Sequence, residues 1–287
     1  MKLSRFYPNI LNDFNVVYIT TNIDKIKNNC IFINLNNLTN LIIPKILKKH
    51  VFIVTQIPIL DNTINSITVS DLNHELVRIY NIFFNLEQNK TKLIGILNDE
   101  FLDYSKVLSD LFNNIIKDKI AIINISSKID EIYNLIGLYS KKKYKYIFII
   151  FTSNEILDYL NILYFDYIIL PKTYHTTSKK GIIYINKFLK TNGVIINNFE
   201  DFKDVIVPNY TVTFGFSNNC TYEIHNLKQH NKIFTGLIIK DKIELSEILV
   251  CINNIEYIYF IFALFAFFDN EYQSVDLIHI FFSKYIL

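Results

Sequence analysis

The residues most suggestive of chemistry lie in one segment, Lys92–Ser105, which has the order of a strand, a loop and a helix. In many nucleotide-binding proteins this order holds a phosphate, because loop glycines let backbone N–H groups approach it and a lysine neutralises its charge. Here the segment has one glycine, Gly95, and three carboxylates, Asp99, Glu100 and Asp103. The segment is therefore either a former phosphate site that has lost its phosphate-binding residues, or a segment that never bound phosphate.

The three carboxylates allow two interpretations. Their oxygens could bind a divalent cation, because Mg²⁺ and Ca²⁺ prefer oxygen ligands. They could also form the polar start of a helix, where negative side chains lie favourably at the positive end of the helix dipole. We favour the helix start.

Glycine is scarce in this chain, which has 6 glycines among 287 residues. An average protein has about 7% glycine. Loops that need several neighbouring glycines are therefore not expected. This excludes dinucleotide-binding G-x-G-x-x-G loops, intact phosphate loops and glycine-rich kinase lids.

The composition indicates a globular protein, with 51% hydrophobic residues and a net charge of +2. No basic stripe with interleaved aromatic residues is present, so we expect no nucleic-acid partner. The most apolar stretch, Tyr257–Phe268, is about a dozen residues long, whereas a membrane span needs about twenty. We therefore predict a buried helix there and no membrane span.

The three cysteines, Cys30, Cys220 and Cys251, are odd in number and widely spaced. This pattern favours reduced thiols over a disulfide framework, and a zinc site would need closer pairs. The N-terminus lacks the apolar run of a signal peptide. We therefore expect a cytoplasmic protein without a metal site.

Short apolar runs alternate with longer helical patterns, which is typical of βαβ units around a mostly parallel sheet. We predict an α/β fold with a first domain over residues 1–88 and a second over residues 89–287. The first domain has predicted strands at Val16–Thr20, Cys30–Asn34, His50–Val54 and Ser66–Val69, and a helix that Asp71 begins.

The second domain begins with the strand of the Lys92–Ser105 segment. Its further predicted strands are Lys119–Ile125, Tyr146–Phe151, Tyr167–Leu170, Gly193–Asn197 and Tyr210–Gly215, with hairpin material at Thr221–Ile239. Its predicted helices are Tyr104–Lys117, Ile129–Tyr139, Asn154–Ile162, Lys180–Leu189 and a closing helical region, Glu244–Leu287. Ile94, Ile122, Phe148 and Ile168 should then lie in adjacent strands of one parallel sheet.

Four short motifs occur in a characteristic order: Val69-Ser-Asp71, Ile94–Asp103, Ile150–Ser153 and Thr213–Gly215. In this order they resemble the V-x-D, I-G-V-T-G-T-N-G-K-T, E-V-S-S and T-F-G motifs of the Mur ligase family. These enzymes are the ATP-dependent amide ligases of peptidoglycan synthesis, and the resemblance is nearest to the UDP-N-acetylmuramoyl-tripeptide ligase branch. It implies a small UDP-sugar-type N-terminal α/β domain and a mostly parallel, P-loop-like central domain.

The resemblance also implies losses at the phosphate loop. Leu102 stands at the family's phosphate-binding lysine, Asp103 at its Mg²⁺-holding hydroxyl and Asn98 at a loop glycine, so these three and Gly95 are vestigial phosphate-loop positions. Carboxylates placed where triphosphate oxygens should lie would repel ATP. Ile150 replaces the metal-binding glutamate of E-V-S-S and has no oxygen to offer Mg²⁺.

Two residues are vestigial catalytic candidates. His175 is what remains of the family's D-H-L-D motif and could be a remnant acid or metal ligand, and Lys180 or its neighbour Lys179 could correspond to the family's carbamylated lysine. Both also have ordinary interpretations, as a solvated loop histidine and an exposed lysine at the start of a helix.

The sequence also ends where the family's third domain, which carries the incoming amino acid, would begin. We therefore expect a pseudoenzyme without ATP- and Mg²⁺-dependent ligation and without a cofactor, which binds another protein such as an intact cell-wall ligase. Two alternatives stay open. One is an active UDP-N-acetylmuramoyl-peptide amino-acid ligase that uses ATP and Mg²⁺ and is completed by another chain; the other is a sugar-nucleotide-binding protein.

Overall fold

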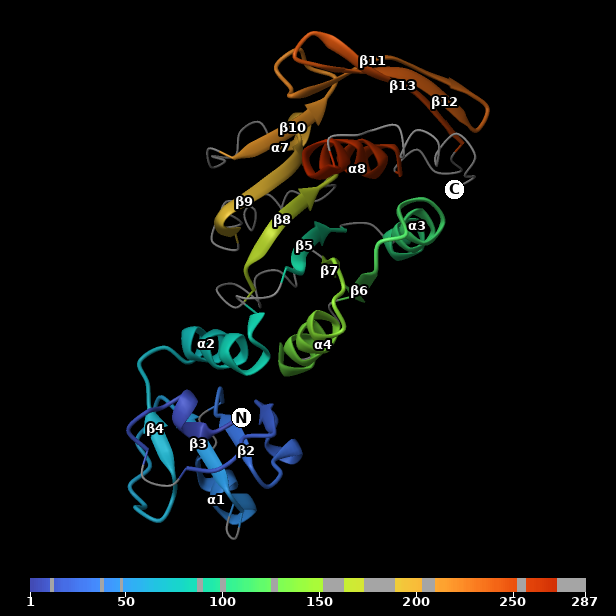
Figure 1. Cartoon of the computed structure of the whole chain (residues 1–287). Coiled ribbons are helices and arrows are strands. Elements are labelled where there is room, and N and C mark those ends of the chain that lie inside the picture. Colours follow the sequence, from blue (N-terminus) through green and yellow to red (C-terminus); the bar gives the residue numbers. More distant parts are fainter. Residues whose placement is uncertain are drawn as a thin grey trace. The chain divides into compact units, whose positions relative to one another are not determined.

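The computed structural model describes residues 1–10, 13–36, 39–46, 49–86, 90–98, 102–124, 129–151, 163–172, 189–202, 210–251 and 257–272, and Figure 1 traces the chain. Its internal contacts divide the chain into two compact units. The first contains residues 1–90 and helix α4 (Ile129–Lys141), and the second begins at Thr91. The domain limits at residues 88 and 89 stay a prediction.

The first unit is built on a four-stranded parallel sheet in the order β1-β2-β3-β4. Its strands are β1 (Tyr18–Thr20), β2 (Cys30–Ile33), β3 (Val51–Thr55) and β4 (Ser66–Thr68), and its helices besides α4 are α1 (Thr39–Ile46), α2 (Leu72–Phe84) and two short 3-10 turns, Leu3–Arg5 and Ile23–Lys25. These strands confirm the four predicted ones to within two residues. Asp71 caps α2 as predicted, because its side chain accepts hydrogen bonds from the N–H groups of Asn73 (2.9 Å) and His74 (3.0 Å).

Helices α2 and α4 pack closely within the first unit. The rings of Tyr80 and Tyr133 are stacked with their centroids 4.6 Å apart. Gly137 of α4 lies directly against the ring of Phe84, since a Cβ atom built on Gly137 would be 2.2 Å from Phe84 Cδ1. The missing side chain at Gly137 therefore lets the two helices approach.

The second unit is built on a nine-stranded sheet in the order β13-β12-β11-β10-β9-β8-β5-β7-β6 (Figure 1). Its strands are β5 (Lys92–Leu97), β6 (Ile120–Asn124), β7 (Tyr146–Phe151), β8 (Phe165–Leu170), β9 (Leu189–Asn198), β10 (Thr211–Gly215), β11 (Tyr222–His230), β12 (Ile233–Lys240) and β13 (Ile243–Cys251). Strands β5 to β11 pair in parallel, and β11, β12 and β13 pair antiparallel.

The predicted adjacency of four strands is confirmed. Phe148 on β7 is the register partner of both Ile94 on β5 and Ile122 on β6, and Ile168 on β8 is the register partner of Gly95. Ile94, Phe148 and Ile168 are fully buried, whereas Ile122 is half-buried because β6 is an edge strand. The fold class is therefore α/β with a mostly parallel sheet, as predicted.

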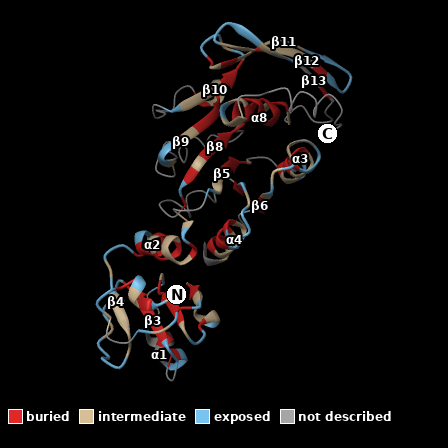
Figure 2. Ribbon diagram, viewed as in Figure 1, coloured by how far each residue is buried: buried red, intermediate tan, exposed pale blue. Residues whose placement is uncertain are grey.

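Helix α8 (Tyr257–Tyr272) covers one face of this sheet and is buried along most of its length (Figure 2). Residues 260–268 are all buried and belong to one cluster with inward-facing residues of β5, β7, β8 and the β11–β13 strands. This confirms the buried helix predicted at Tyr257–Phe268. None of the described helices is long and apolar enough to cross a membrane.

Two shorter helices complete the described part of the second unit. Helix α3 (Tyr104–Leu111) continues into a π-helical turn, Phe112–Ile116, so that together they span nearly all of the predicted helix Tyr104–Lys117. Helix α7 (Phe199–Phe202) is a single turn after β9.

The predicted closing helical region, Glu244–Leu287, is wrong over its first part, because Ile243–Cys251 forms strand β13. A two-residue turn, Asp241-Lys242, joins β12 to β13, and both residues have positive φ values of 53° and 66°. Such turns are usually marked by Asn-Gly or Asp-Gly. This turn contains no glycine, so its sequence did not reveal the hairpin.

The predicted helix Lys180–Leu189 is wrong at its last residue, because Leu189 begins strand β9 and pairs with Phe165 of β8. Pairing with a neighbouring strand overrides the helical preference of a leucine. The rest of this helix and the whole predicted helix Asn154–Ile162 lie outside the described residues.

Candidate functional site

The Lys92–Ser105 segment forms strand β5 and the start of α3, joined by a loop of residues 98–103 that we call the β5–α3 loop. The structure describes Asn98, Leu102 and Asp103 of this loop. Strand β5 lies between β7 and β8, and the loop follows its carboxyl end. Open α/β sheets bind their ligands at this edge. The predicted order of strand, loop and helix is therefore present at the edge where a ligand would bind.

Gly95 lies inside strand β5 rather than in the loop. A Cβ atom at this position would be 2.9 Å from the Phe151 ring and 3.2 Å from the Phe165 ring. These distances are shorter than ordinary van der Waals contact, so glycine is needed here to let two aromatic rings pack on the strand. Gly95 thus has a packing role that does not depend on a phosphate.

Asn98 makes hydrogen bonds within the loop and to strand β7, and Leu102 packs against the core. The Nδ2 group of Asn98 donates a hydrogen bond to the backbone oxygen of Leu102 (2.9 Å), and the Asn98 amide N–H donates to the backbone oxygen of Phe151 (2.9 Å). The Leu102 side chain packs against the hydrophobic core beneath α8. The position that resembles the family's phosphate lysine therefore makes apolar contacts.

Asp103 is the N-cap of α3, which supports the helix-start interpretation of this carboxylate. Its Oδ1 atom accepts a hydrogen bond from the N–H of Lys106 (3.0 Å). Its own amide N–H donates to the hydroxyl oxygen of Tyr257 on α8 (3.0 Å). Amide groups at the start of a helix are the ones that bind phosphate in nucleotide sites. Here the amide of Asp103 is already bound to a side chain of the same chain.

Aromatic residues fix the start of α3 to the start of α8. The rings of Tyr104 and Phe260 are stacked with centroids 3.9 Å apart and an interplanar angle of 16°. The rings of Tyr104 and Tyr257 meet edge to face at 6.3 Å. We call Tyr104, Tyr257 and Phe260 the aromatic seal. Sequence analysis did not identify it, because its members come from two helices far apart in the chain.

A cationic side chain lies at the same edge of the sheet. Lys172 follows strand β8, and its Nζ atom is 4.5 Å from the centre of the Tyr259 ring on α8. A cation over an aromatic face is attracted by the negative charge density of the ring. Lys172 therefore contributes to the packing of α8 at this edge.

Some predicted site residues are not assembled into a site. Ile150, which resembles the metal-binding glutamate position, is 7% exposed and belongs to the core. Among the described residues, no three His, Cys, Asp or Glu side chains come together in a way that could hold a metal ion. His175, Lys180, Asp99 and Glu100 lie outside the described residues.

The other end of α8 carries a polar cluster at the amino ends of the strands. Glu271 accepts hydrogen bonds from Lys92 Nζ (2.7 and 2.8 Å) and from the hydroxyl groups of Tyr146 (3.0 Å) and Tyr167 (2.8 Å). Burial and then the hydrogen bond to Glu271 raise the pKa of Tyr167, so this tyrosine stays protonated and donates. A carboxylate at a helix C-terminus opposes the helix dipole, and Lys92 offsets that charge.

Asp118 is a second anchor of this helix end. Its Oδ2 atom accepts hydrogen bonds from Lys145 Nζ (2.7 Å) and from the hydroxyl group of Tyr272 (2.6 Å). Burial acts to raise the pKa of Asp118, but these two hydrogen bonds outweigh it and hold the pKa below its usual value. We interpret both clusters as anchors of α8, because they lie at the edge opposite the β5–α3 loop.

Neither a protein-family model nor a curated protein sequence matches the chain. Solved structures do. The chain is similar to a UDP-N-acetylmuramoyl-L-alanyl-D-glutamate–2,6-diaminopimelate ligase, with a TM-score of 0.78 and 13% identity over 100% of this chain and 67% of that one.

Two further similar structures are MurF ligases. For MurF from Acinetobacter baumannii the TM-score is 0.60 with 12% identity over 96% of this chain and 64% of that one. For MurF from Thermotoga maritima in complex with ADP it is 0.59 with 13% identity over 93% and 65%. The chain thus spans about two thirds of the length of these ligases. At these identities the likeness establishes the fold, and the chain has the fold of the Mur ligases.

Proposed function

We propose that this chain is a Mur-ligase-like protein that does not carry out ATP-dependent ligation and acts by binding another protein. The observation that carries the proposal is the hydrogen bond from the Asp103 amide to the Tyr257 hydroxyl group (3.0 Å). This hydrogen bond uses the backbone N–H of Asp103 at the start of α3, and N–H groups at the start of a helix are the ones that bind phosphate in nucleotide sites. The aromatic seal holds the two helices together at this point, so a triphosphate would have to displace packed rings.

Charge and chemistry at the β5–α3 loop support the same proposal. Leu102 packs against the core and supplies no positive charge, while the carboxylate of Asp103 would face a phosphate with the same sign of charge. Phosphoryl transfer depends on positioning and charge neutralisation. The described part of the loop provides neither in the manner of a phosphate loop.

Calorimetric titration with ATP and Mg²⁺ tests the proposal. We expect no binding heat, whereas an intact Mur ligase in the same buffer serves as the positive control. Micromolar binding would contradict the proposal. The Tyr257→Phe variant removes the hydroxyl group and keeps the ring, so it tests whether that hydrogen bond alone blocks the amide; we expect no ATP binding there either, because Leu102 and Asp103 are unchanged.

A phosphate-release assay distinguishes this proposal from the alternative that the chain is an active ligase completed by another chain. The chain would be mixed with ATP, Mg²⁺, UDP-muramoyl peptides and amino acids, with and without a Mur ligase whose own ATP site has been inactivated by mutation. We expect no release above that of the inactivated ligase alone. Release that needs both chains would favour a ligase completed by another chain.

A sugar-nucleotide-binding role is the second candidate. Three adjacent parallel strands of the first unit each carry a buried polar residue at or just beyond the carboxyl end, namely Thr20, Asn34 and Thr55. Ligands bind at this edge of parallel sheets. A UDP sugar that binds the native state would raise the melting temperature. An unchanged melting temperature at millimolar UDP sugar would contradict this role.

The partner is proposed from the resemblance to be an intact cell-wall ligase, with both proteins in the cytoplasm. Co-purification of the tagged chain with each purified candidate ligase tests this. We expect a complex at a fixed ratio with at least one ligase, and retention by an unrelated ATPase would mark the binding as non-specific.

A further inference from the structure

Strand β9 has a wide bulge close to its start. Phe165 of β8 is the register partner of Leu189, and the next register pair joins Tyr167 to Val194. A single residue of β8 therefore stands opposite four residues of β9, 190–193, which we call the β9 bulge. Bulged residues lie outside the regular hydrogen-bond ladder, so their backbone is freer to change conformation than that of a paired strand.

The β9 bulge contains Asn192-Gly193, which is the only Asn-Gly pair in the sequence. Asn192 is exposed, and none of the described residues forms a hydrogen bond with its side chain. Some other asparagine side chains are held in place, because the side-chain oxygens of Asn28 and Asn198 accept hydrogen bonds from backbone N–H groups (2.6 and 3.0 Å). The side-chain amide of Asn192 is therefore free to turn toward its own main chain.

An asparagine followed by glycine can react with its own main chain. The backbone nitrogen of the glycine attacks the carbonyl carbon of the asparagine side chain, ammonia leaves, and a five-membered cyclic imide forms. Water then opens the ring at either carbonyl group and gives aspartate or isoaspartate. Glycine favours the attack because it has no Cβ atom to hinder its nitrogen and because its backbone is conformationally permissive.

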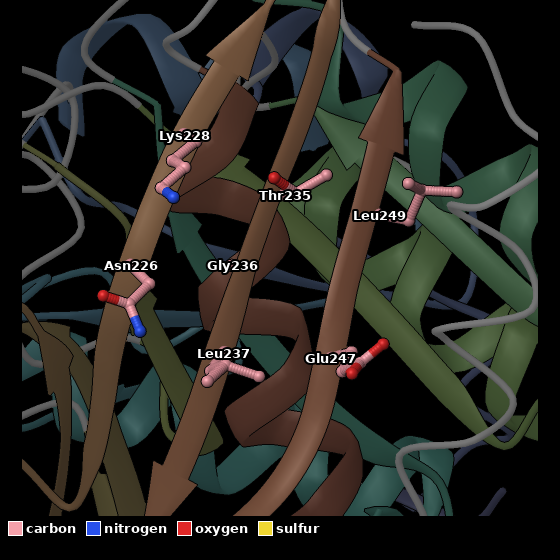
Figure 3. Close-up of a pocket in the computed structure, with 7 residues that line it drawn as sticks. All are labelled: Asn226, Lys228, Thr235, Gly236, Leu237, Glu247 and Leu249. Carbon is pink, nitrogen blue, oxygen red and sulfur yellow. The ribbon is translucent and has the colours of Figure 1, made fainter.

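The chain offers two comparisons for this pair, and Figure 3 shows both. Asn226 lies in the bulge of β11 and is exposed like Asn192, but the next residue is Leu227, whose side chain hinders its backbone nitrogen. Gly236 has no Cβ atom, but it follows Thr235, whose side chain has no carbonyl group to be attacked. Only the β9 bulge therefore combines an exposed asparagine with a following glycine.

We propose that Asn192 is a site of spontaneous deamidation, with water as the only co-reactant. The nitrogen of Gly193 bonds to Cγ of Asn192, the Cγ–Nδ2 bond breaks, and the proton of the Gly193 amide leaves with the ammonia. Hydrolysis of the imide restores that proton and leaves a carboxylate, so nothing is oxidised or reduced. A neutral amide becomes an anion, which lowers the net charge of the chain by one unit from +2. This inference does not rest on the proposed function.

The isoaspartate product should disturb the β9 bulge, because it inserts one more carbon atom into the main chain directly before Gly193. Gly193 is buried and tightly surrounded. A Cβ atom built on it would be 2.8 Å from Leu189 Cδ2 and 3.0 Å from the backbone oxygen of Phe165. The longer main chain must therefore displace Gly193 or the paired residue after it, Val194. The aspartate product keeps the main chain and adds only an exposed carboxylate.

Peptide mapping by mass spectrometry tests the proposal on the folded full chain, incubated at mildly alkaline pH in isotopically labelled water. We expect Asn192 to convert with time to two products that each carry one solvent oxygen, and an isoaspartate-specific methyltransferase should methylate one of them. Asn226 should convert at least tenfold more slowly. Asn192→Gln is the matched variant, because its longer side chain would have to close a six-membered ring, and the reaction at this position should be lost.

A second measurement tests the consequence for the bulge. The separated isoaspartate form should melt at a lower temperature than the Asn192→Asp variant, which carries the same charge on an unaltered main chain. Equal melting temperatures would contradict the crowding at Gly193.

Two results would overturn the proposal itself. One is that Asn192 stays intact in the folded chain over the period in which it converts in the urea-unfolded chain, since the bulge would then protect it. The other is that Asn192 converts no faster than Asn226 in the folded chain, since the glycine would then have no effect.

Discussion

The contact between Gly137 and Phe84 leads to a prediction for the Gly137→Ala variant. Helix propensity and packing predict opposite signs for the change in its free energy of unfolding. Replacing a helix glycine by alanine ordinarily stabilises a helix by about 0.8–1 kcal/mol, because alanine restricts the unfolded chain. Gly137 lies in the middle of α4, so helix propensity alone predicts that Gly137→Ala is stabilising.

The packing predicts the opposite. The new Cβ atom would lie 2.2 Å from Phe84 Cδ1 and 2.3 Å from both Cγ and Cε1, more than 1 Å closer than carbon atoms approach. Phe84 is 8% exposed and its ring is stacked near Tyr80, so it has little room to turn away. Overpacking of this kind lowers stability by about 1–3 kcal/mol. After the gain in propensity is subtracted, we expect Gly137→Ala to be destabilising by about 1 kcal/mol.

Urea unfolding followed by far-UV circular dichroism measures this change, with a double-mutant cycle as the control. In a Phe84→Leu background the ring is gone, so the same Gly137→Ala change should become stabilising by up to about 1 kcal/mol. The two backgrounds should therefore give opposite signs. If Gly137→Ala is stabilising in both, α2 and α4 do not pack as described.

Three further substitutions should change the stability of the fold in a direction that the structure predicts. Lys143 has a φ of 59°, so Lys143→Gly should be stabilising by about 1 kcal/mol in urea unfolding, whereas Lys142→Gly, at a neighbouring exposed residue without positive φ, should not be. Asp103→Ala removes the N-cap of α3 and should be destabilising by about 1 kcal/mol in the same assay, and an unchanged midpoint would contradict the cap. Hydrogen bonds hold the pKa of Asp118 below its unfolded value, so its stabilising contribution is present above about pH 4 and is lost as the pH falls further. Stability curves of the unaltered chain and of Asp118→Asn should therefore run parallel from about pH 6 to about pH 4 and converge from about pH 4 to about pH 2, and curves that stay parallel down to about pH 2 would contradict this assignment.

Much of the fold could be predicted because the strands of the second unit are buried on both faces. Tyr146–Phe151 was predicted to the residue, since six consecutive apolar residues bounded by polar ones are typical of a central parallel strand. Asp71 was predicted as a helix cap because its side chain acts on N–H groups only two and three residues away. Local signals of this kind can be recognised in a single sequence.

The contacts that define the candidate site are not local. The amide of Asp103 and the hydroxyl of Tyr257 are 154 residues apart, and no spacing rule connects them. The strand Ile243–Cys251 was missed for a related reason, because pairing with β12 rather than its own sequence makes it a strand. That the β5–α3 loop lacks the residues that would bind a phosphate stays a prediction from the sequence, and the structure adds what Asn98, Leu102 and Asp103 contact.

The positions of the glycines in this chain weaken the inference that a low glycine count excludes tight loops. The described residues with positive φ are Asn29, Asn85, Lys117, Lys143, Asn226, Asn231, Asp241 and Lys242, and none of the described glycines is among them. The described glycines instead lie where a Cβ atom would be crowded, as at Gly95 and Gly137. Asparagine tolerates the left-handed region better than most residues. A low glycine count therefore does not by itself exclude tight loops in this protein. The proposal that the β5–α3 loop binds no phosphate therefore rests on contacts rather than on the glycine count: the amide of Asp103 donates a hydrogen bond to the Tyr257 hydroxyl oxygen, and Leu102 packs against the core.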